Sequence, residues 1–350
     1  MGTERQRVLA WAMLGFAAAG AVSVLLLRIL DVPLNVQAIV EARSRLIDAV
    51  VALLPWPDVL AVPLRPVLHD IALAPDFLAP TALILLLERL YPARPEQRVL
   101  STALVQDFVW RLAQLAIFAW IIGWFAGLLG GFYDRRLAFL TVQAVDRLPP
   151  TVSLILAIVA ADFLAWFHHV VRHKVRWCWW FHMIHHSQTR MNLWTDSRYH
   201  VVEYFVAAVI VFLPVFAFKL GRSATFWLAW MMLWYPRLYH ANIRSTFGVL
   251  RFVLVTPQSH RVHHSLLPQH QDKNFGVLFS VWDRVFGTQS PDEDVYPDTG
   301  VRAADFPHEA GWGSVLSLRA FAAQMIYPFR LVGRWMMNRA PGTLGSSDLP

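Results

Sequence analysis

Long apolar runs separated by short polar segments organise this chain. The clear runs cover residues 112–130, 151–167, 201–220 and 224–239. A second candidate span that ends with residues 77–87 is weaker, because Asp76 and two prolines interrupt it. Because a helix needs about 20 mainly apolar residues to cross the hydrocarbon of a bilayer, the pattern predicts an all-α fold, an integral membrane helical bundle.

The N-terminal region contains a further apolar run, residues 8–27, with Arg5 and Arg7 before it. A signal peptide has similar charges, but it has a shorter apolar run and a cleavage site of small residues before a soluble domain. We therefore expect a first transmembrane helix here. Residues 34–74 mix apolar and polar positions with several prolines, which indicates amphipathic surface helix and loop.

The C-terminal region becomes polar after Ser290. Residues 315–337 then return to apolar positions interleaved with Arg319, Arg330 and Arg334. This pattern is typical of an amphipathic helix that lies in a membrane interface. The last residues, APGTLGSSDLP, are predicted to be a flexible tail.

The composition supports a membrane protein. Of the 350 residues, 56% are hydrophobic and 16% are charged, whereas a soluble domain has about 25% charged residues. The single cysteine, Cys178, excludes an internal disulfide framework and any CxxC metal site. A metal site in this chain would have to use histidine and carboxylate ligands.

The charge pattern predicts an orientation. The net charge is +7, but the basic residues flank apolar runs and do not line a soluble face, so we expect no nucleic acid partner. Only residues 221–223 separate two apolar runs, which predicts a hairpin with His200 and His240 at the same side of the membrane. The same side carries most of the basic residues near these runs: Arg172, Lys174, Arg176, Arg190, Arg198, Arg244, Arg251 and Arg261.

By the positive-inside rule, that side is cytoplasmic. Arg135, Arg136 and Arg147 then lie on the opposite side, which counts against the assignment without reversing it. Arginine greatly outnumbers lysine, as in proteins of GC-rich bacteria. We therefore expect a bacterial inner-membrane protein.

Histidines gather in three short clusters on the predicted cytoplasmic side. The first is HVVRH at residues 169–173, the second HMIHH at 182–186 and the third HRVHH at 260–264. Positions i, i+3 and i+4 share one face of a helix, so each triplet is expected to aim three imidazoles at one point. Thr256 and Pro257 form a helix-start signal before the third cluster.

The clusters predict a metal centre. A chance H-x-x-H-H is expected roughly 0.02 times in such a chain, so two copies outweigh the alternative of polar histidines at the membrane interface. Eight ligands are too many for one ion and suit two ions with about four each. The hairpin histidines raise the predicted ligand set to ten: His169, His173, His182, His185, His186, His200, His240, His260, His263 and His264. Iron keeps open positions for O₂, although all-nitrogen sites also admit zinc, copper and nickel.

Other polar residues receive separate predictions. Asp162 is seven residues before His169, two turns along the same helix face, and is expected to hydrogen-bond a ligand histidine. A substrate contact or a buried pair with arginine is the alternative. Weaker candidates for such support are Glu203, Asn242 and Asn274.

Four histidines are predicted to lie outside the ligand set. His168 points about 100° from its neighbour on a helix, so it is expected to be a bystander. His270 is expected in a loop, and His69 and His308 are expected to be unrelated to the site.

The order of these motifs resembles the fatty acid hydroxylase / sterol desaturase superfamily over residues 151–289. The segments that match the family's motifs are DFLAWFHHVVRH, WWFHMIHHSQTRMN, RYHVVEYF, YHANIR, VTPQSHRVHHS and KNFGVLFSVWDRVFGT. One departure is Val170, where the family often has arginine after the first ligand. The resemblance implies an integral-membrane, non-haem di-iron oxygenase acting on lipid C–H bonds, with the histidine clusters as iron ligands. Asp162 and Asn274, proposed above as supporting residues, are the further candidates for the catalytic site.

The resemblance divides the chain into three regions. Residues 1–150 are expected to be N-terminal transmembrane and amphipathic helices, residues 151–290 the catalytic domain, and residues 291–350 a polar loop, amphipathic helix and tail. The N-terminal 150 residues carry no motif of the family.

The favoured function is hydroxylation or desaturation of a lipid or sterol-like substrate with O₂ and two electrons. The chain has no dinucleotide-binding glycine motif and no CxxCH haem site, so the electrons are expected from a ferredoxin, cytochrome or reductase partner. A hydrolytic or structural zinc protein is the alternative, but neither triplet contains the glutamate that a general base requires. A metal transporter would place its histidines in mid-span, whereas these lie at span ends.

Overall fold

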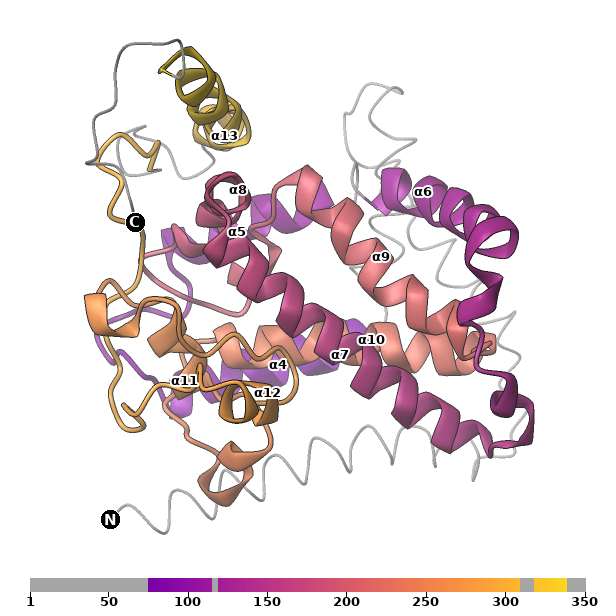
Figure 1. The fold of residues 1–350 in the computed structure, drawn as a ribbon. Coiled ribbons are helices and arrows are strands. Elements are labelled where there is room, and N and C mark those ends of the chain that lie inside the picture. The colour runs from indigo at the N-terminus through magenta and orange to yellow at the C-terminus, as the bar shows by residue number, and fades with distance from the viewer. Residues whose placement is uncertain (1–74, 115–118, 309–317, 339–350) are drawn as a thin grey trace, which may run out of the picture.

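The computed structural model describes residues 75–114, 119–308 and 318–338. The predicted helix at 8–27, the mixed segment 34–74, His69 and the C-terminal tail lie outside the described residues. Within these ranges the chain is helical and contains only isolated β-bridges, with no strand, so the all-α prediction is confirmed for this part of the chain. The helices, named as in Figure 1, are α4 Pro75–Leu90, α5 Thr102–Ala113, α6 Ala119–Phe132, α7 Pro150–Lys174, α8 Arg176–His186, α9 Val201–Ala217, α10 Arg222–His240, α11 Pro257–His263, α12 Val281–Val285 and α13 Leu318–Asn338.

Helix α7 carries the first histidine cluster into the structure. It has 25 residues, which gives a length of about 38 Å at 1.5 Å per residue. Among the described residues it is the one helix long and apolar enough to cross a membrane, while α9 is apolar but shorter. The predicted run 151–167 is therefore the first part of a longer helix whose last two turns hold His169 and His173.

Helices α9 and α10 form the predicted hairpin (Figure 1). The turn comes slightly earlier than expected, at residues 218–221, and Lys219 has a left-handed φ of 46°. The amides of Phe218 and Leu220 donate to carbonyls in the last turn of α9 and close it. As a result, His200 and His240 lie at the same end of the bundle, where α8, α11 and α12 gather.

The bundle core explains why these helices lie side by side. Ile158 and Ala161 of α7, Val215 of α9 and Leu228 of α10 pack in one buried cluster with Leu278. Partly buried side chains about one or two turns away, Leu154 of α7 and Met231 and Tyr235 of α10, extend this cluster along the helices. The core thus fixes the ends of α7, α9 and α10 relative to the histidine segments.

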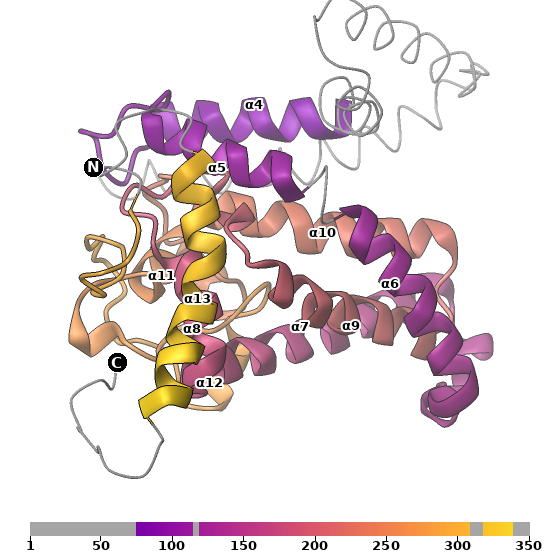
Figure 2. The same cartoon turned by 90° about the horizontal axis from the view of Figure 1, so that it is seen from above.

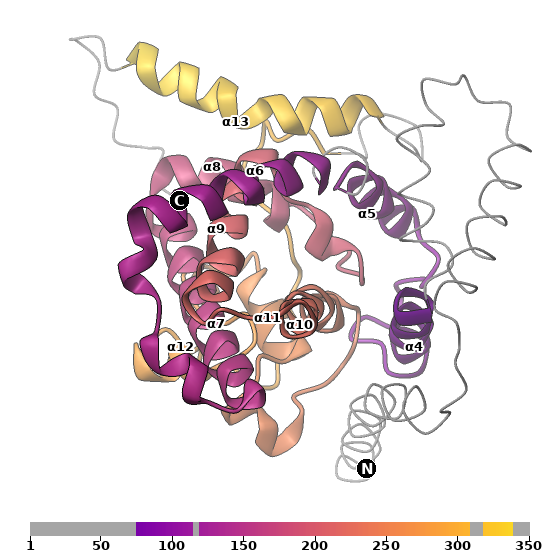
Figure 3. The ribbon, with the colours of Figure 1, turned by 90° about the vertical axis from the view of Figure 1, so that its right-hand side faces the viewer.

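The predicted run 112–130 divides in the structure. It contains the end of α5 and most of α6, with residues 115–118 between them outside the described ranges. α6 packs against α9, whereas Ile84 and Leu87 of α4 join a core cluster with Trp234 and Leu238 of α10. Figure 3, which looks approximately along α10, shows α4 and α7 on opposite sides of it.

Helix α13 lies across the bundle, roughly perpendicular to α7, α9 and α10 (Figure 2). It packs against α8 through a cluster that includes Tyr327 and Ile184. The helix also exposes Phe329 and Met337, with 53% and 70% of their surface accessible, although one face of the Phe329 ring contacts Phe181 of α8. The predicted amphipathic helix at 315–337 therefore forms, with its described start at Leu318.

Candidate metal centre

Nine of the ten predicted ligand histidines converge in two groups. Within each group, the ring nitrogens that each residue offers lie within 4.8 Å of one another. We call them the five-histidine group, which contains His169, His173, His182, His186 and His263, and the four-histidine group, which contains His185, His240, His260 and His264. They are supplied by α7, α8, α10, and α11 with the residue that follows it.

The two triplets divide between the groups in a reciprocal manner. His182 and His186 of α8 enter the five-histidine group, while His185 enters the other. His260 and His264 enter the four-histidine group, while His263 crosses to the first. The expectation that each triplet aims three rings at one point is therefore wrong.

The reason for this division is the helical angle. Residues i+3 and i+4 are about 100° apart around a helix axis, since the helix has 3.6 residues per turn. The pair i and i+4 is separated by only about 40°, so these two rings reach one point and the ring at i+3 reaches a second point beside it. One H-x-x-H-H helix thus contributes to two neighbouring sites.

The four-histidine group has the spacing of metal ligands. The Nε2 atom of His240 is 2.8 Å from Nε2 of His260 and 3.1 Å from Nε2 of His185. The Nε2 atoms of His260 and His264 are 3.1 Å apart. Nitrogens bound tetrahedrally to zinc at 2.0–2.1 Å are about 3.3 Å from each other, so four imidazoles in this arrangement surround a space suited to one ion.

The five-histidine group offers unpaired ring nitrogens. Nε2 of His169, His173 and His263 is buried and has no hydrogen-bond partner among the described residues. Nε2 of His182 and His186 face each other at 3.3 Å. A buried polar atom without a partner is costly, and a bound ion would satisfy all five nitrogens. The residues present therefore fit a metal ion at each group.

Burial keeps these imidazoles in the neutral form that binds metal. Loss of hydration lowers the pKa of His263 to about 4. The same cause holds the pKa well below its usual value for the other ligand candidates of α8 and the third cluster: His182, His185, His186, His260 and His264. Protons consequently do not compete with a metal ion near pH 7.

Backbone carbonyls and one carboxylate orient several rings. Nδ1 of His169 is 2.8 Å from the carbonyl oxygen of Phe275, and Nδ1 of His263 is 2.8 Å from that of Lys273. Nδ1 of His182 is 3.0 Å from a carboxylate oxygen of Glu203. An Nδ1–H that donates to such an acceptor leaves Nε2 free to bind the metal. Glu203, the weaker candidate in the sequence, is therefore in direct contact with a ligand histidine.

Asn274 lies between the two carbonyls that orient His169 and His263. Its backbone has a left-handed φ of 58°, which asparagine tolerates better than most residues. Its side-chain amide donates to the carbonyl of Ser259, and its side-chain oxygen accepts from the amide of Ser290. The residue has no contact of its own with a ring nitrogen and shapes the loop that does.

Asp162 has a different place from the one expected. Its carboxylate accepts hydrogen bonds from the amides of Leu278 and Phe279 and from the indole of Trp282. These contacts fasten the segment after Phe275 to α7, and none of them is with a ligand histidine. The expectation of a direct bond to an imidazole is replaced by an indirect support of the loop.

His200 lies in neither histidine group. Its Nδ1 accepts from the amide of Val202 as the N-cap of α9, and its Nε2 is 3.0 Å from the carbonyl of Met325 in α13. His200 is therefore the N-cap of α9 and joins this helix to α13, in place of the predicted role as a ligand. His270 and His308 also lie outside both histidine groups, as expected. Nε2 of His270 is 2.8 Å from a carboxylate oxygen of Asp292, and the ring of His308 contacts that of Phe306.

A cavity of about 170 Å³ opens beside the metal centre. Its metal end is lined by His185, His240 and His260 with Tyr199 and Tyr239. Further along α7, α9 and α10, toward the middle of the bundle, the lining becomes apolar: Ala165, Ala207, Ile210, Val211, Met232 and Leu233. His168 also lines this cavity, outside both histidine groups, so it faces the space that a substrate would occupy.

Several residues around the centre could not be recognised from sequence patterns. The carbonyls of Lys273 and Phe275 are backbone atoms, so no residue type indicates their role. Tyr199 lies in the segment between α8 and α9, and its ring centre is 4.9 Å from that of His185. A tyrosine directly before the hairpin histidine was the available sign.

The comparisons with known proteins agree with the motif order. The fatty acid hydroxylase family model matches residues 154–288, which contain every histidine of both groups and confirm the resemblance. An ornithine lipid hydroxylase of Rhizobium tropici is 25% identical over 307 residues, which cover 85% of this chain and 89% of that protein. No solved structure matches the chain significantly.

Alkylglycerol monooxygenases match a shorter part of the chain. The Danio rerio protein is 32% identical over 139 residues, 40% of this chain and 31% of the relative. The human protein is 31% identical over 139 residues, 38% of this chain and 29% of the relative. The match thus spans less than a third of these monooxygenases and most of the ornithine lipid hydroxylase.

Proposed function

Because residues 154–288 of this chain form a fatty acid hydroxylase domain, we propose that the protein is a membrane-bound, non-haem di-iron oxygenase that hydroxylates a C–H bond of a lipid. Its relatives are lipid hydroxylases and monooxygenases, so the enzyme is an oxidoreductase. The observation that carries the proposal is the pairing of two histidine groups with a cavity that begins at their rings.

The ligand set supports two iron ions. Five imidazoles in one group and four in the other provide nitrogen ligands without thiolate, and iron binds such sites with positions left for O₂. Two iron ions would supply the reduction of O₂ and the oxidation of an unactivated C–H bond. In the isolated protein zinc is able to take the same ligands.

The reaction has a fixed balance. One C–H bond, one O₂, two electrons and two protons give one C–OH and one water. Loss of a second hydrogen in place of hydroxylation gives an alkene. The electrons come from an external donor, a ferredoxin, cytochrome or reductase, and the metal centre lies at the cytoplasmic side of a bacterial inner membrane in this proposal.

The cavity is suited to orienting a lipid. Apolar residues such as Ile210 and Met232 would hold a hydrocarbon segment in the bundle, while Tyr199 and Tyr239 hold polar groups at the metal end. This gradient favours attack at a carbon near the polar end of the substrate. Buried aromatic and aliphatic walls also exclude water from the reacting carbon.

The alternative, a hydrolytic zinc protein, requires a general base next to the metal. Among the described residues that line the cavity, Asp196 is the single carboxylate, and it lies 3.5 Å from the guanidinium of Arg237. Glu203 is committed to Arg172 and His182. These ion pairs leave no carboxylate in the described lining available as a base, so the oxygenase is favoured.

The test is reconstitution of the purified full chain with Fe²⁺, a chemical or enzymatic electron source and lipid extract under ¹⁸O₂. We expect a lipid product heavier by one labelled oxygen. A product lighter by two hydrogens would assign desaturation, whereas metal-dependent hydrolysis without oxygen incorporation would overturn the proposal. The His185→Ala variant is the control for activity that does not use the metal centre.

A further inference from the structure

Two buried carboxylates outside the matched domain contact the segments that follow the ligand histidines. Asp107 of α5 is fully buried, and Glu88 of α4 has 2% of its surface exposed. Both belong to the N-terminal part of the chain, where the sequence contains no motif of the family. The question is what these acidic residues do in an apolar region.

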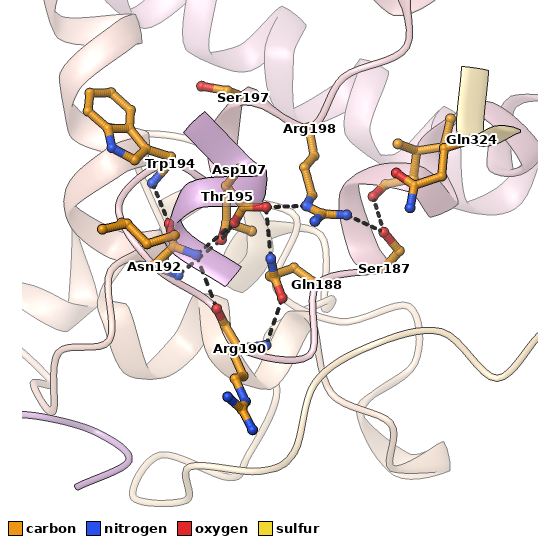
Figure 4. A network of polar contacts seen from close by, with 12 residues as sticks. Asp107, Ser187, Gln188, Arg190, Asn192, Trp194, Thr195, Ser197, Arg198 and Gln324 are labelled. Carbon is orange, nitrogen blue, oxygen red and sulfur yellow. Dashed lines mark hydrogen bonds and ion pairs between the residues drawn. The ribbon is translucent and has the colours of Figure 1, made fainter. Parts of the chain in front are cut away.

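Asp107 is the centre of a hydrogen-bond network with the segment between α8 and α9 (Figure 4). One of its oxygens accepts from Gln188 at 2.7 Å and from the guanidinium of Arg198. The other accepts from Asn192 at 2.7 Å and from Thr195 at 2.8 Å. Four donors on an eleven-residue stretch thus share one carboxylate.

This network reaches the end of α8 directly. Arg198 also donates to the hydroxyl of Ser187, and that hydroxyl donates to the carbonyl of Ile184. His185 and His186 lie between the two ends of this chain of bonds and belong to different histidine groups. Asp107 therefore holds a part of the helix that serves both groups.

Glu88 contacts the end of α10 and also the segment that Asp107 holds. One carboxylate oxygen accepts from the amide of Asn242 at 2.9 Å and from the amide of Leu193 at 3.2 Å. Asn242 also exchanges hydrogen bonds with the backbone of Arg94. Because His240 is two residues before Asn242, these bonds fix the end of α10 that carries a ligand of the four-histidine group.

We infer that Asp107 and Glu88 are positioning residues of the metal centre, and that α4 and α5 are part of its supporting structure. A carboxylate that accepts several hydrogen bonds is a directional anchor for the groups that donate to it. Residues that orient ligands commonly change metal affinity by about 10- to 100-fold when they are replaced. The inference rests on the proposed metal centre and does not depend on which lipid is the substrate.

The site geometry predicts a selective effect for each residue. Asp107→Asn is expected to weaken both metal ions, because His185 and His186 serve different groups. Glu88→Met removes the oxygen that accepts from the amides of Asn242 and Leu193. This variant is expected to weaken chiefly the ion of the four-histidine group, because His240 belongs to that group alone. A carboxylate that only stabilised the fold would not produce this difference.

The experiment is a titration of the metal-free full chain with Co²⁺, followed through its visible absorption bands and through metal release to a chelator. The control is Asp305→Asn, which removes a carboxylate that accepts from Tyr327 and Arg334, away from the histidines. We expect two Co²⁺ per wild-type chain, about 10- to 100-fold weaker binding in Asp107→Asn, and binding close to wild type in Asp305→Asn.

Wild-type affinity for both ions in Asp107→Asn and Glu88→Met would overturn the inference, as would an equal loss in Asp305→Asn. Absence of Co²⁺ binding in the wild-type chain would instead refute the metal centre itself. If Asp107→Asn does not fold, Thr195→Val removes one of its four donors and carries the same test, with a smaller loss expected at both ions.

Discussion

His182 and His185 occupy the same turn of α8 and belong to different histidine groups. Nε2 of His182 faces Nε2 of His186 at 3.3 Å, whereas Nε2 of His185 faces Nε2 of His240 at 3.1 Å. One face of α8 therefore lies between the two proposed metal sites and supplies ligands to both. Replacing one of these residues should affect one site more than the other.

The first prediction is that His185→Ala loses about one of two metal ions per chain and all turnover. The substitution removes one of four ligands from the four-histidine group but leaves the five-histidine group complete. Metal analysis of the purified protein checks this result. His168→Ala is the control, since His168 belongs to neither group, and it should keep wild-type metal content while changing substrate KM through the cavity wall. Equal metal loss in both variants would contradict the assignment.

The second prediction concerns Asp162→Asn. The carboxylate accepts from two amides and an indole of the segment 278–282, so an amide in its place loses acceptors and leaves buried donors unpaired. We expect about 1–3 kcal/mol lower stability and a smaller loss of metal than in His185→Ala. Trp282→Phe removes one donor only and should show part of the effect in a thermal unfolding experiment. Metal loss as large as in His185→Ala would mean that Asp162 orients a ligand after all.

The third prediction is the topology of the hairpin. Gly221 is exposed at the turn between α9 and α10, and Gln271 is exposed at the end where the histidines gather. With Cys178 replaced by serine, cysteines introduced at these two positions should react with an impermeant thiol reagent from opposite sides of the membrane. We expect Gln271→Cys to react from the cytoplasmic side. Reaction of both from one side would refute the spanning arrangement.

Much of this centre was predictable because helical periodicity is a local property. The spacing of the three clusters indicated which histidines are ligand candidates, and Thr256 was correctly placed as a helix cap, now seen with Ser259 in a capping box. The hairpin also followed from the short break between two apolar runs. What the periodicity did not settle was the division of each triplet, since two neighbouring target points both lie within reach of one helix face.

The misplaced residues share a different cause. Asp162 has the right helical phase for contact with His169. Its carboxylate oxygens instead accept hydrogen bonds from Leu278 and Trp282, which lie more than 100 residues later in the chain. The contacts of Asp107 and Glu88 are also distant in sequence, from 81 residues for Gln188 to 154 residues for Asn242. Buried polar groups take whichever donors the tertiary fold brings to them, and local patterns do not record those partners.

The last prediction uses the contact between Glu203 and His182. Glu203 also lies 3.2 Å from the guanidinium of Arg172, and all three side chains are buried. Glu203→Gln keeps an oxygen that accepts from His182 but removes the charge, so we expect about 10- to 100-fold weaker metal binding at the five-histidine group. Glu203→Ala also removes the acceptor and leaves Arg172 as an unpaired buried charge, which should cost about 3–5 kcal/mol of stability.

The double variant Glu203→Gln with Arg172→Met separates these two effects, because it removes the buried charge together with its partner. We expect it to recover stability relative to Glu203→Ala, measured by thermal unfolding, without recovering metal affinity, measured by Co²⁺ titration. Recovery of both would show that Glu203 serves only to neutralise Arg172. Recovery of stability alone would show that the carboxylate acts on His182, because that contact is the one that the double variant leaves weakened.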